Sequence, residues 1–295
     1  MRSKRLIKQP GNGILLLTLA VLIAASCAVK RREVIAPVAA RPALEASADQ
    51  LVERYNQVAR GIRSLNAGIV LVPTVGSRFT GVIEEYREVR GFLLAQKPTH
   101  IRLIGQAPVV AKNIFDMVSD GETFRIFLPS KNRFVTGPAE FERRAEKPIE
   151  NLRPQHLLDA IFWPELPAGR LILFEELDAA PERYYILTQL RERQGLEIAR
   201  KLWFDRADLS LARIQIYAPG GRLAADVRYA DWQPLADLRY PRHIRLARPQ
   251  DDYQLELRIT KLALNEDISI ERFRLDQPPG TELVHVGPER PEARP

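Results

Sequence analysis

The feature that most constrains the fold is a strict alternation of apolar and polar residues in two segments of the second half of the chain. Apolar residues occupy every second position in residues 223–229, and residues 253–259 repeat the pattern. Successive side chains of a β-strand point to opposite faces, so each segment is predicted to be a strand with one dry and one wet face. Adjacent strands of this kind cannot form a layer buried on both faces. We therefore expect the sheet to curl around something apolar.

The period of two recurs along most of the chain. It predicts strands at residues 67–74, 83–95, 99–106, 113–118, 123–128, 134–136, 171–177, 183–191, 196–205 and 209–217. Asp120-Gly121 and Gly220-Gly221 are turn signals between such strands. The predicted fold class is mainly β with some α: a single curled antiparallel sheet, or incomplete β-barrel, wrapped around or covered by α-helices.

A helix is predicted at residues 47–65, and it is the expected cover of the dry face. Ser47 is a favourable N-cap residue and Asp49 lies in the first turn. Apolar residues follow at spacings of four, three, four and three, which places them in one stripe. These residues are Leu51, Tyr55, Val58, Ile62 and Leu65.

Residues 138–167 interrupt the strand pattern. Their apolar residues predict one or two short helices that end at Trp163-Pro164; these residues are Ile149, Leu152, Leu157, Leu158 and Ile161. Trp163, Trp203 and Trp232 are interpreted as core or cavity-lining residues rather than as a platform for a sugar.

The start of the chain has the pattern of a secretory signal peptide. Four basic residues precede an apolar run at residues 14–25, and small residues follow it. This run is shorter than the roughly 20 residues that a transmembrane helix needs. We therefore expect residues 1–26 to be a signal peptide, and a permanent transmembrane helix is the weaker alternative.

Cys27 is the only cysteine, so the chain has no internal disulfide. Ala24-Ala25-Ser26-Cys27 resembles the lipobox of bacterial lipoproteins. The resemblance implies cleavage before Cys27, lipidation of its sulfur and its new amine, and anchoring that more than one acyl chain makes stable. Ala28 follows the cysteine, which in enteric bacteria implies sorting to the outer membrane, facing the periplasm. The alternative is an ordinary signal peptide.

The predicted organisation after the signal peptide is a lipidated N-terminus and tether at 27–46, one domain at 47–286 and a disordered tail at 287–295. The formal net charge of +7 includes the four cations of residues 1–26 and falls to +3 without them. No basic block interleaved with aromatic residues is present, so nucleic-acid binding is unsupported.

Sequence motifs for catalysis are missing, and we expect neither an enzyme nor a cofactor. The four histidines lie far apart, without the spacing of zinc ligands. There is no Gly-x-Ser-x-Gly motif and no glycine-rich phosphate loop. Glu84-Glu85 and Glu175-Glu176 are neighbours on predicted strands, and neighbouring carboxylates there face opposite sides of the sheet.

Three groups of residues carry a family resemblance. Asp120-Gly121 with the following 124–129 hairpin strand, Trp203-Phe204-Asp205, and the ending Phe273-Arg274-Leu275 before Pro278-Pro279-Gly280 resemble the LolA/LolB-like lipoprotein carriers. The resemblance implies an incomplete antiparallel barrel closed by helices over an apolar cavity that binds acyl chains. It also implies a periplasmic carrier protein as partner, and a lid at 138–167.

One loop follows from the same resemblance. In the membrane-bound branch of that family an apolar side chain protrudes from a loop after a proline, and here that loop contains Pro108, Val109 and Val110. The alternative is that Val109 and Val110 are strand residues of the core.

Two functions are compatible with the sequence. The first is binding of lipid or lipoprotein acyl chains in an apolar cavity, in lipid or lipoprotein transport at the outer membrane. The candidate lining residues are Leu223, Val227, Leu255 and Leu257. The second is a structural lipoprotein with a filled interior that docks a partner in a cell-envelope complex. An empty cavity or interdigitated large side chains on the concave face would distinguish the two.

Overall fold

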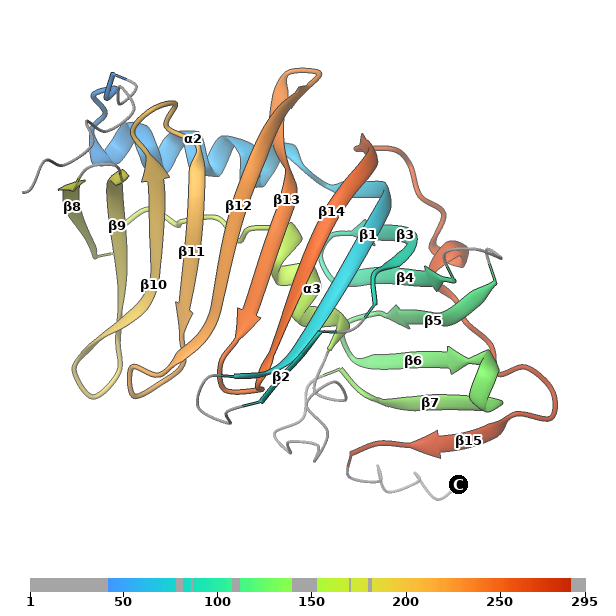
Figure 1. The fold of residues 1–295 in the computed structure, drawn as a ribbon. Coiled ribbons are helices and arrows are strands. Elements are labelled where there is room, and N and C mark those ends of the chain that lie inside the picture. Colours follow the sequence, from blue (N-terminus) through green and yellow to red (C-terminus); the bar gives the residue numbers. More distant parts are fainter. Residues whose placement is uncertain are drawn as a thin grey trace, which may run out of the picture. The chain divides into compact units, whose positions relative to one another are not determined.

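The computed structural model describes residues 42–77, 82–85, 87–107, 112–139, 153–169, 171–179 and 182–287. Within these residues, fifteen strands form one sheet (Figure 1). The predictions on the signal peptide, Cys27, most of the tether, the loop with Pro108, Val109 and Val110, and the last eight residues of the tail lie outside the described residues.

The sheet runs in the order β15-β7-β6-β5-β4-β3-β1-β14-β13-β12-β11-β10-β9-β8, and β2 pairs with β1. All pairings are antiparallel except that of β15 with β7. The strands are β1 (Ser64–Ser77), β2 (Val82–Glu85), β3 (Val89–Gln96), β4 (His100–Gln106), β5 (Asn113–Ser119), β6 (Thr123–Leu128), β7 (Arg133–Pro138), β8 (Ile172–Ala179), β9 (Glu182–Glu192), β10 (Leu196–Asp205), β11 (Leu211–Tyr217), β12 (Leu223–Leu235), β13 (Leu238–Arg248), β14 (Tyr253–Leu264) and β15 (Glu282–His285).

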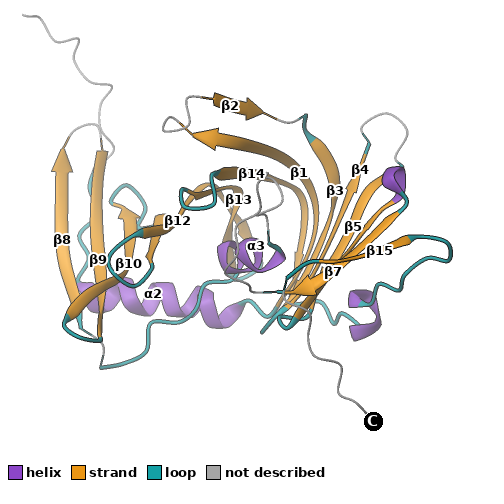
Figure 2. Cartoon of the chain, turned by 90° about the horizontal axis from the view of Figure 1, so that it is seen from below, coloured by secondary structure: helices purple, strands orange, loops and turns teal. Residues whose placement is uncertain are grey.

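The predicted fold class is confirmed: the described chain is mainly β, with one curled, unclosed sheet and two α-helices on its concave side (Figure 2). The alternation of dry and wet residues is the cause of this arrangement. In β14, Tyr253, Leu255 and Leu257 are buried, whereas Gln254 and Arg258 between and beside them are exposed. Only the inner face therefore has apolar surface to cover.

Helix α2 (Ala48–Gly61) begins as predicted but is shorter than predicted. Ser47 accepts a hydrogen bond from the backbone N–H of Gln50, whose side chain accepts from the N–H of Ser47, and the two form a capping box. The helix ends because the side chain of Asn265 donates to the carbonyl of Gly61 and accepts from the N–H of Arg63. Ile62 and Leu65 are buried beyond its end, and β1 already starts at Ser64.

Helix α3 (Pro154–Ile161) confirms one short helix in the predicted 138–167 region. Its buried residues Leu157, Leu158 and Ile161 belong to the same apolar cluster as the inner face of the sheet. Residues 162–169 continue from it, and Asn56 of α2 pairs with both backbone groups of Leu166 there. Ile149 and Leu152 lie outside the described residues. Two 3-10 turns complete the elements: η2 (Pro129–Lys131) and η4 (Ile270–Phe273).

The predicted strand at 83–95 is wrong as one element, because two strands share a single edge of β1. Strand β3 pairs with the first part of β1, up to Leu71, and β2 pairs with its last part, from Thr74. The chain must break between Glu85 and Val89 to place both strands along the same neighbour.

Candidate functional site

Three of the four predicted lining residues lie together on the inner face: Val227, Leu255 and Leu257. Val227 pairs with Leu246, which pairs with Leu255 on the next strand, so Val227, Leu246 and Leu255 form one row across β12, β13 and β14. Leu257 lies two residues along β14 from Leu255. Leu223, at the start of β12, is half-buried, pairs with Tyr217 beyond a register shift in the β11–β12 ladder, and is not part of the apolar cluster of the inner face.

The space over this row is filled by side chains. Val227 and Leu255 are 2% exposed and Leu257 is 1% exposed. All three belong to one apolar cluster with Leu51 of α2 and Leu158 of α3. At these positions, the two helices and the sheet therefore pack together as a core.

Trp163, which is 3% exposed, lies at the centre of this core. Its ring stacks on Tyr55 at a centroid distance of 6.1 Å and on Tyr240 at 6.2 Å. Tyr229 meets it edge-on at 5.4 Å, and Trp232 lies at 5.7 Å. Helix α2, the segment after α3 and strands β12 and β13 thus meet at one aromatic cluster, which we call the Trp163 cluster. Aromatic pairs at such distances stabilise a fold beyond the area that they bury.

Three tyrosine hydroxyls tie the Trp163 cluster to the backbone near α3. Tyr229 donates to the carbonyl of Ala160 and Tyr240 to that of Ile161, each at 3.0 Å. These carbonyls belong to the last turn of α3, where the backbone carbonyl groups have no hydrogen-bond partners within the helix. Tyr55 donates to the carbonyl of Pro164 at 2.9 Å. Burial raises the pKa of Tyr55 to about 12 and also raises the pKa values of Tyr229 and Tyr240, so all three are neutral donors at ordinary pH.

Polar side chains also occur on the inner face. Gln189 is buried and accepts a hydrogen bond from Nε of Arg200, whose Nη1 donates to the carbonyl of Pro164 at 3.2 Å. His156 of α3 lies 2.6 Å from the hydroxyl of Tyr253. Burial, and then the charges of two nearby arginines, lower the pKa of His156 to about 3. None of these polar residues was predicted from the sequence.

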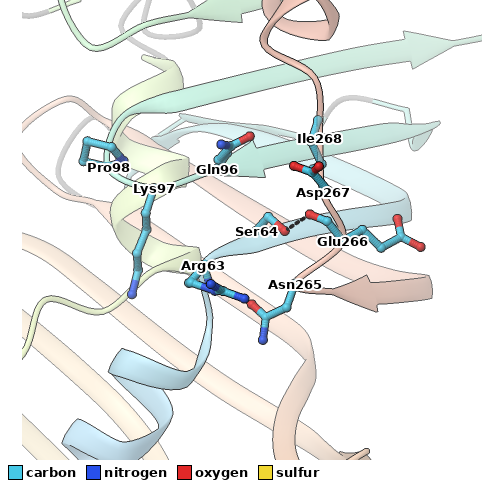
Figure 3. Close-up of a pocket in the computed structure, with 9 residues that line it drawn as sticks. All are labelled: Arg63, Ser64, Gln96, Lys97, Pro98, Asn265, Glu266, Asp267 and Ile268. Atoms are coloured by element: carbon cyan, nitrogen blue, oxygen red, sulfur yellow. Dashed lines mark hydrogen bonds between the residues drawn. The ribbon is translucent and has the colours of Figure 1, made fainter.

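A cavity of about 610 Å³ opens at another place, where α2 ends (Figure 3). Lys97 lines it and donates from Nζ to the carbonyl of Ala59, while burial lowers the pKa of its amine. Ser64 donates from its hydroxyl to the carbonyl of Glu266 at 2.6 Å. Most of the cavity's lining residues are polar or charged, with both signs of charge, which does not favour an acyl chain. The lining consists of Arg63, Ser64, Gln96, Lys97, Pro98, Asn265, Glu266, Asp267 and Ile268, and includes none of the four predicted residues.

The apolar inner face extends beyond what the helices bury. Half-buried apolar side chains pack against the edges of the core on both halves of the sheet. Those that continue the inner-face rows are Ile216 on β11 and Val89, Phe115 and Ile126 on β3, β5 and β6. These four side chains are half-buried, so they are apolar surface of the inner face that solvent still reaches.

The outer face holds one residue that the sequence interpretation misplaced. Trp203 lies between Leu202 and Phe204, which are both buried on the inner side, so its own side chain points outward. There it packs on Tyr184 at 5.7 Å and under the guanidinium of Arg213 at 5.3 Å. Its assignment to the core or cavity lining is therefore wrong.

The paired carboxylates of β8 have separate ion-pair partners. Glu175 accepts from the hydroxyl of Thr188 and lies 3.6 Å from Lys201, whereas Glu176 pairs with Arg206. No group of three or more His, Cys, Asp or Glu side chains among the described residues is arranged to hold a metal ion. In the same residues, neither helix is long and apolar enough to span a membrane.

The described residues form an open, curled β-sheet, and two helices pack on its apolar inner face. No family model matches the chain, and no curated protein does. Similar solved structures include a LolA superfamily protein from Nitrosomonas europaea, with 14% identity, 78% of this chain and 99% of that chain covered, and a TM-score of 0.49.

Two further similar structures have comparable values. A putative outer membrane lipoprotein-sorting protein domain from Vibrio parahaemolyticus has 11% identity, 77% and 97% coverage, and a TM-score of 0.47. A DUF1329 family protein from Desulfovibrio piger has 15% identity, 76% and 94% coverage, and a TM-score of 0.48.

Proposed function

We propose that this protein is a lipid-anchored lipoprotein of the bacterial cell envelope that binds the acyl chains of lipids or lipoproteins on the inner face of its sheet. The observation that supports this function is the apolar inner face itself, which continues past both helices to the half-buried Ile216, Phe115 and Ile126. The sequence resemblance adds a role in lipid or lipoprotein transport at the outer membrane, with a periplasmic carrier protein as partner.

The energetics of this proposal rest on hydrophobic transfer. Each buried methylene contributes about 0.8 kcal/mol before the costs of immobilising the chain. Micromolar affinity corresponds to about 8 kcal/mol, so a chain of ordinary length suffices without a hydrogen bond. Because Val227, Leu255 and Leu257 are already packed, the first carbons to bind would contact the half-buried margin of the inner face, which contains Ile216 and Phe115.

Ile216→Trp tests the margin as a binding surface. Indole at this position should occupy the space of several methylenes, and we expect affinity for a fluorescent fatty acid to fall by about tenfold. Tyr217→Trp is the matched control, because this neighbouring residue on β11 points to the outer face, where its hydroxyl donates to Gln215. Fluorescence titration measures both variants. Equal affinities of the two would contradict the placement of the chain at this margin.

Cys27→Ser tests the membrane anchor. Without the thiol no diacylglycerol can be attached, so we expect the variant to move from the membrane fraction to the soluble periplasmic fraction. Cell fractionation and labelling with a radioactive fatty acid measure the result. Equal membrane retention of the variant, with no label on the natural protein, would refute lipidation at Cys27.

The second candidate function, docking of a partner by a protein with a filled interior, is favoured by the tight burial of Val227, Leu255 and Leu257. Mass spectrometry of organic extracts from the purified protein separates the two functions. Bound lipid, together with saturable fatty-acid binding, supports the acyl-chain function. Lipid-free extracts without probe binding would leave partner docking as the function.

A further inference from the structure

Strand β8 is a free edge of the sheet (Figure 1). Within the described residues its one strand neighbour is β9, and the pairing runs from Ile172 opposite Gln189 to Ala179 opposite Glu182. The N–H of Leu190 donates to the carbonyl of Leu171 at 2.9 Å, so Leu171 and every second residue after it are the ones hydrogen-bonded to β9. Residues directly opposite in an antiparallel pair alternate between bonded and non-bonded pairs. The N–H and C=O groups of alternate residues from Ile172 onward therefore point away from β9.

These outward residues are Ile172, Phe174, Glu176 and Asp178. They offer a row of backbone donors and acceptors to which a further strand can pair.

The β8 edge lacks the features that usually protect a free edge. Proteins prevent an edge strand from pairing with other chains by making it short or by placing lysine or proline on it. Strand β15, at the other edge, has four residues. Strand β8 has eight residues, with neither lysine nor proline. Its apolar half is open to solvent as well: Leu171 is 58% exposed, Leu173 54% and Phe174 43%.

The other half of β8 is acidic. The side chains of Glu175, Glu176 and Asp178 are about half exposed. Their cationic partners are more buried, with the side chains of Lys201, Arg183 and Arg206 23%, 24% and 4% exposed. The groups that a neighbouring chain would meet are therefore carboxylates. Opposite charges on directly opposed residues of two strands are favourable.

A second copy of this chain does not fit the β8 edge. The antiparallel register that pairs most of β8 with a symmetry-related β8 places Glu175 opposite the same residue of the copy, and like charges directly opposite are destabilising. That register also places Glu176 opposite Phe174 and Asp178 opposite Ile172. Neither pairing satisfies the acidic half.

We propose that β8 binds an extended segment of a partner protein by strand addition, with basic residues opposite Glu175–Asp178 and apolar residues opposite Leu171–Phe174. Backbone hydrogen bonds to the outward residues supply the pairing, and the two halves of the edge set its direction. In the antiparallel orientation, the partner segment is basic at its N-terminal half and apolar at its C-terminal half. This site is separate from the inner face and does not depend on acyl-chain binding.

A labelled synthetic peptide tests the proposal with the full chain. The probe is the octapeptide Lys-Val-Arg-Lys-Val-Ile-Thr-Tyr, which follows the charge order that the edge requires, and fluorescence anisotropy measures its binding. We expect saturable binding that weakens with salt. The same peptide with its three basic residues changed to Glu, and one N-methylated at alternate residues that would donate to β8, should each bind roughly tenfold more weakly. Equal binding of the N-methylated peptide would overturn strand addition.

Two variants of β8 test the same edge from the protein side. Phe174→Pro removes an outward N–H without removing a hydrogen bond to β9, and Leu173→Lys places a charge on the exposed apolar half. Each should weaken peptide binding by roughly tenfold, whereas Leu196→Lys, at a leucine that is 61% exposed but lies on β10, should not. Circular dichroism verifies folding, and Leu173→Lys suffices if the proline variant misfolds. Unchanged binding by Leu173→Lys, or a dimer in sedimentation that this variant abolishes, would overturn the proposal.

Discussion

Trp163→Ala is expected to lower the free energy of unfolding by about 3–5 kcal/mol, the usual cost of removing a large aromatic side chain from a core. The expectation follows from the position of Trp163, which is 3% exposed and contacts four other aromatic rings. These rings come from α2, β12 and β13. The resulting cavity would therefore loosen the helices and the sheet together.

Denaturant unfolding followed by circular dichroism measures this loss, and Trp203→Ala is the matched control. Trp203 is half-buried on the outer face, where it contacts Tyr184 and Arg213. Its removal should cost about 1–2 kcal/mol, because no enclosed cavity results. Equal losses for the two variants would show that the Trp163 cluster is not the centre of the core.

The period-two pattern predicted most strands because most strands have one wet face. Strand β13 escaped prediction because its pattern is interrupted: Tyr240 and Pro241 are adjacent and both buried. Strand β15 has no local signal at all. Its four residues follow a proline-rich segment, and its place depends on contacts distant in sequence, such as the hydrogen bond from Asn132 to the carbonyl of Gly280 and the ion pair of Arg133 with Glu282.

For the candidate site, the sequence predicted which strand residues face the apolar side of the sheet. It did not predict how closely the helices pack over them. Alternation places Val227, Leu255 and Leu257 on the dry face, and that face is where they lie. How deeply a short helix enters the curl is a tertiary property, and no spacing in residues 154–161 encodes it. The same limit applies to the Trp163 cluster, whose rings come from separate parts of the chain. Trp203 shows the converse error, since aromatic character alone does not decide which face a strand residue occupies.

His156 predicts a pH dependence of stability. It is neutral in the folded protein, because burial, and then the charges of Arg248 and Arg153, lower its pKa to about 3. An unfolded chain would bind a proton at the ordinary histidine pKa of about 6.5. Protons therefore favour the unfolded state between these two values. The stability is complete above about pH 6.5 and is lost as the pH falls toward 3, by at most about 5 kcal/mol from this residue alone.

His156→Asn isolates this contribution from that of the carboxylates, which also titrate in acid. The asparagine side chain can also form a hydrogen bond with the hydroxyl of Tyr253, which lies 2.6 Å from Nδ1 of His156, but it does not titrate. We expect the unfolding free energy of the variant to fall less steeply between pH 6.5 and pH 4 than that of the natural protein. The difference in slope should correspond to the uptake of up to about one proton fewer on unfolding. Urea unfolding at several pH values measures both slopes. Parallel slopes for the natural protein and His156→Asn would mean that His156 takes up its proton without unfolding.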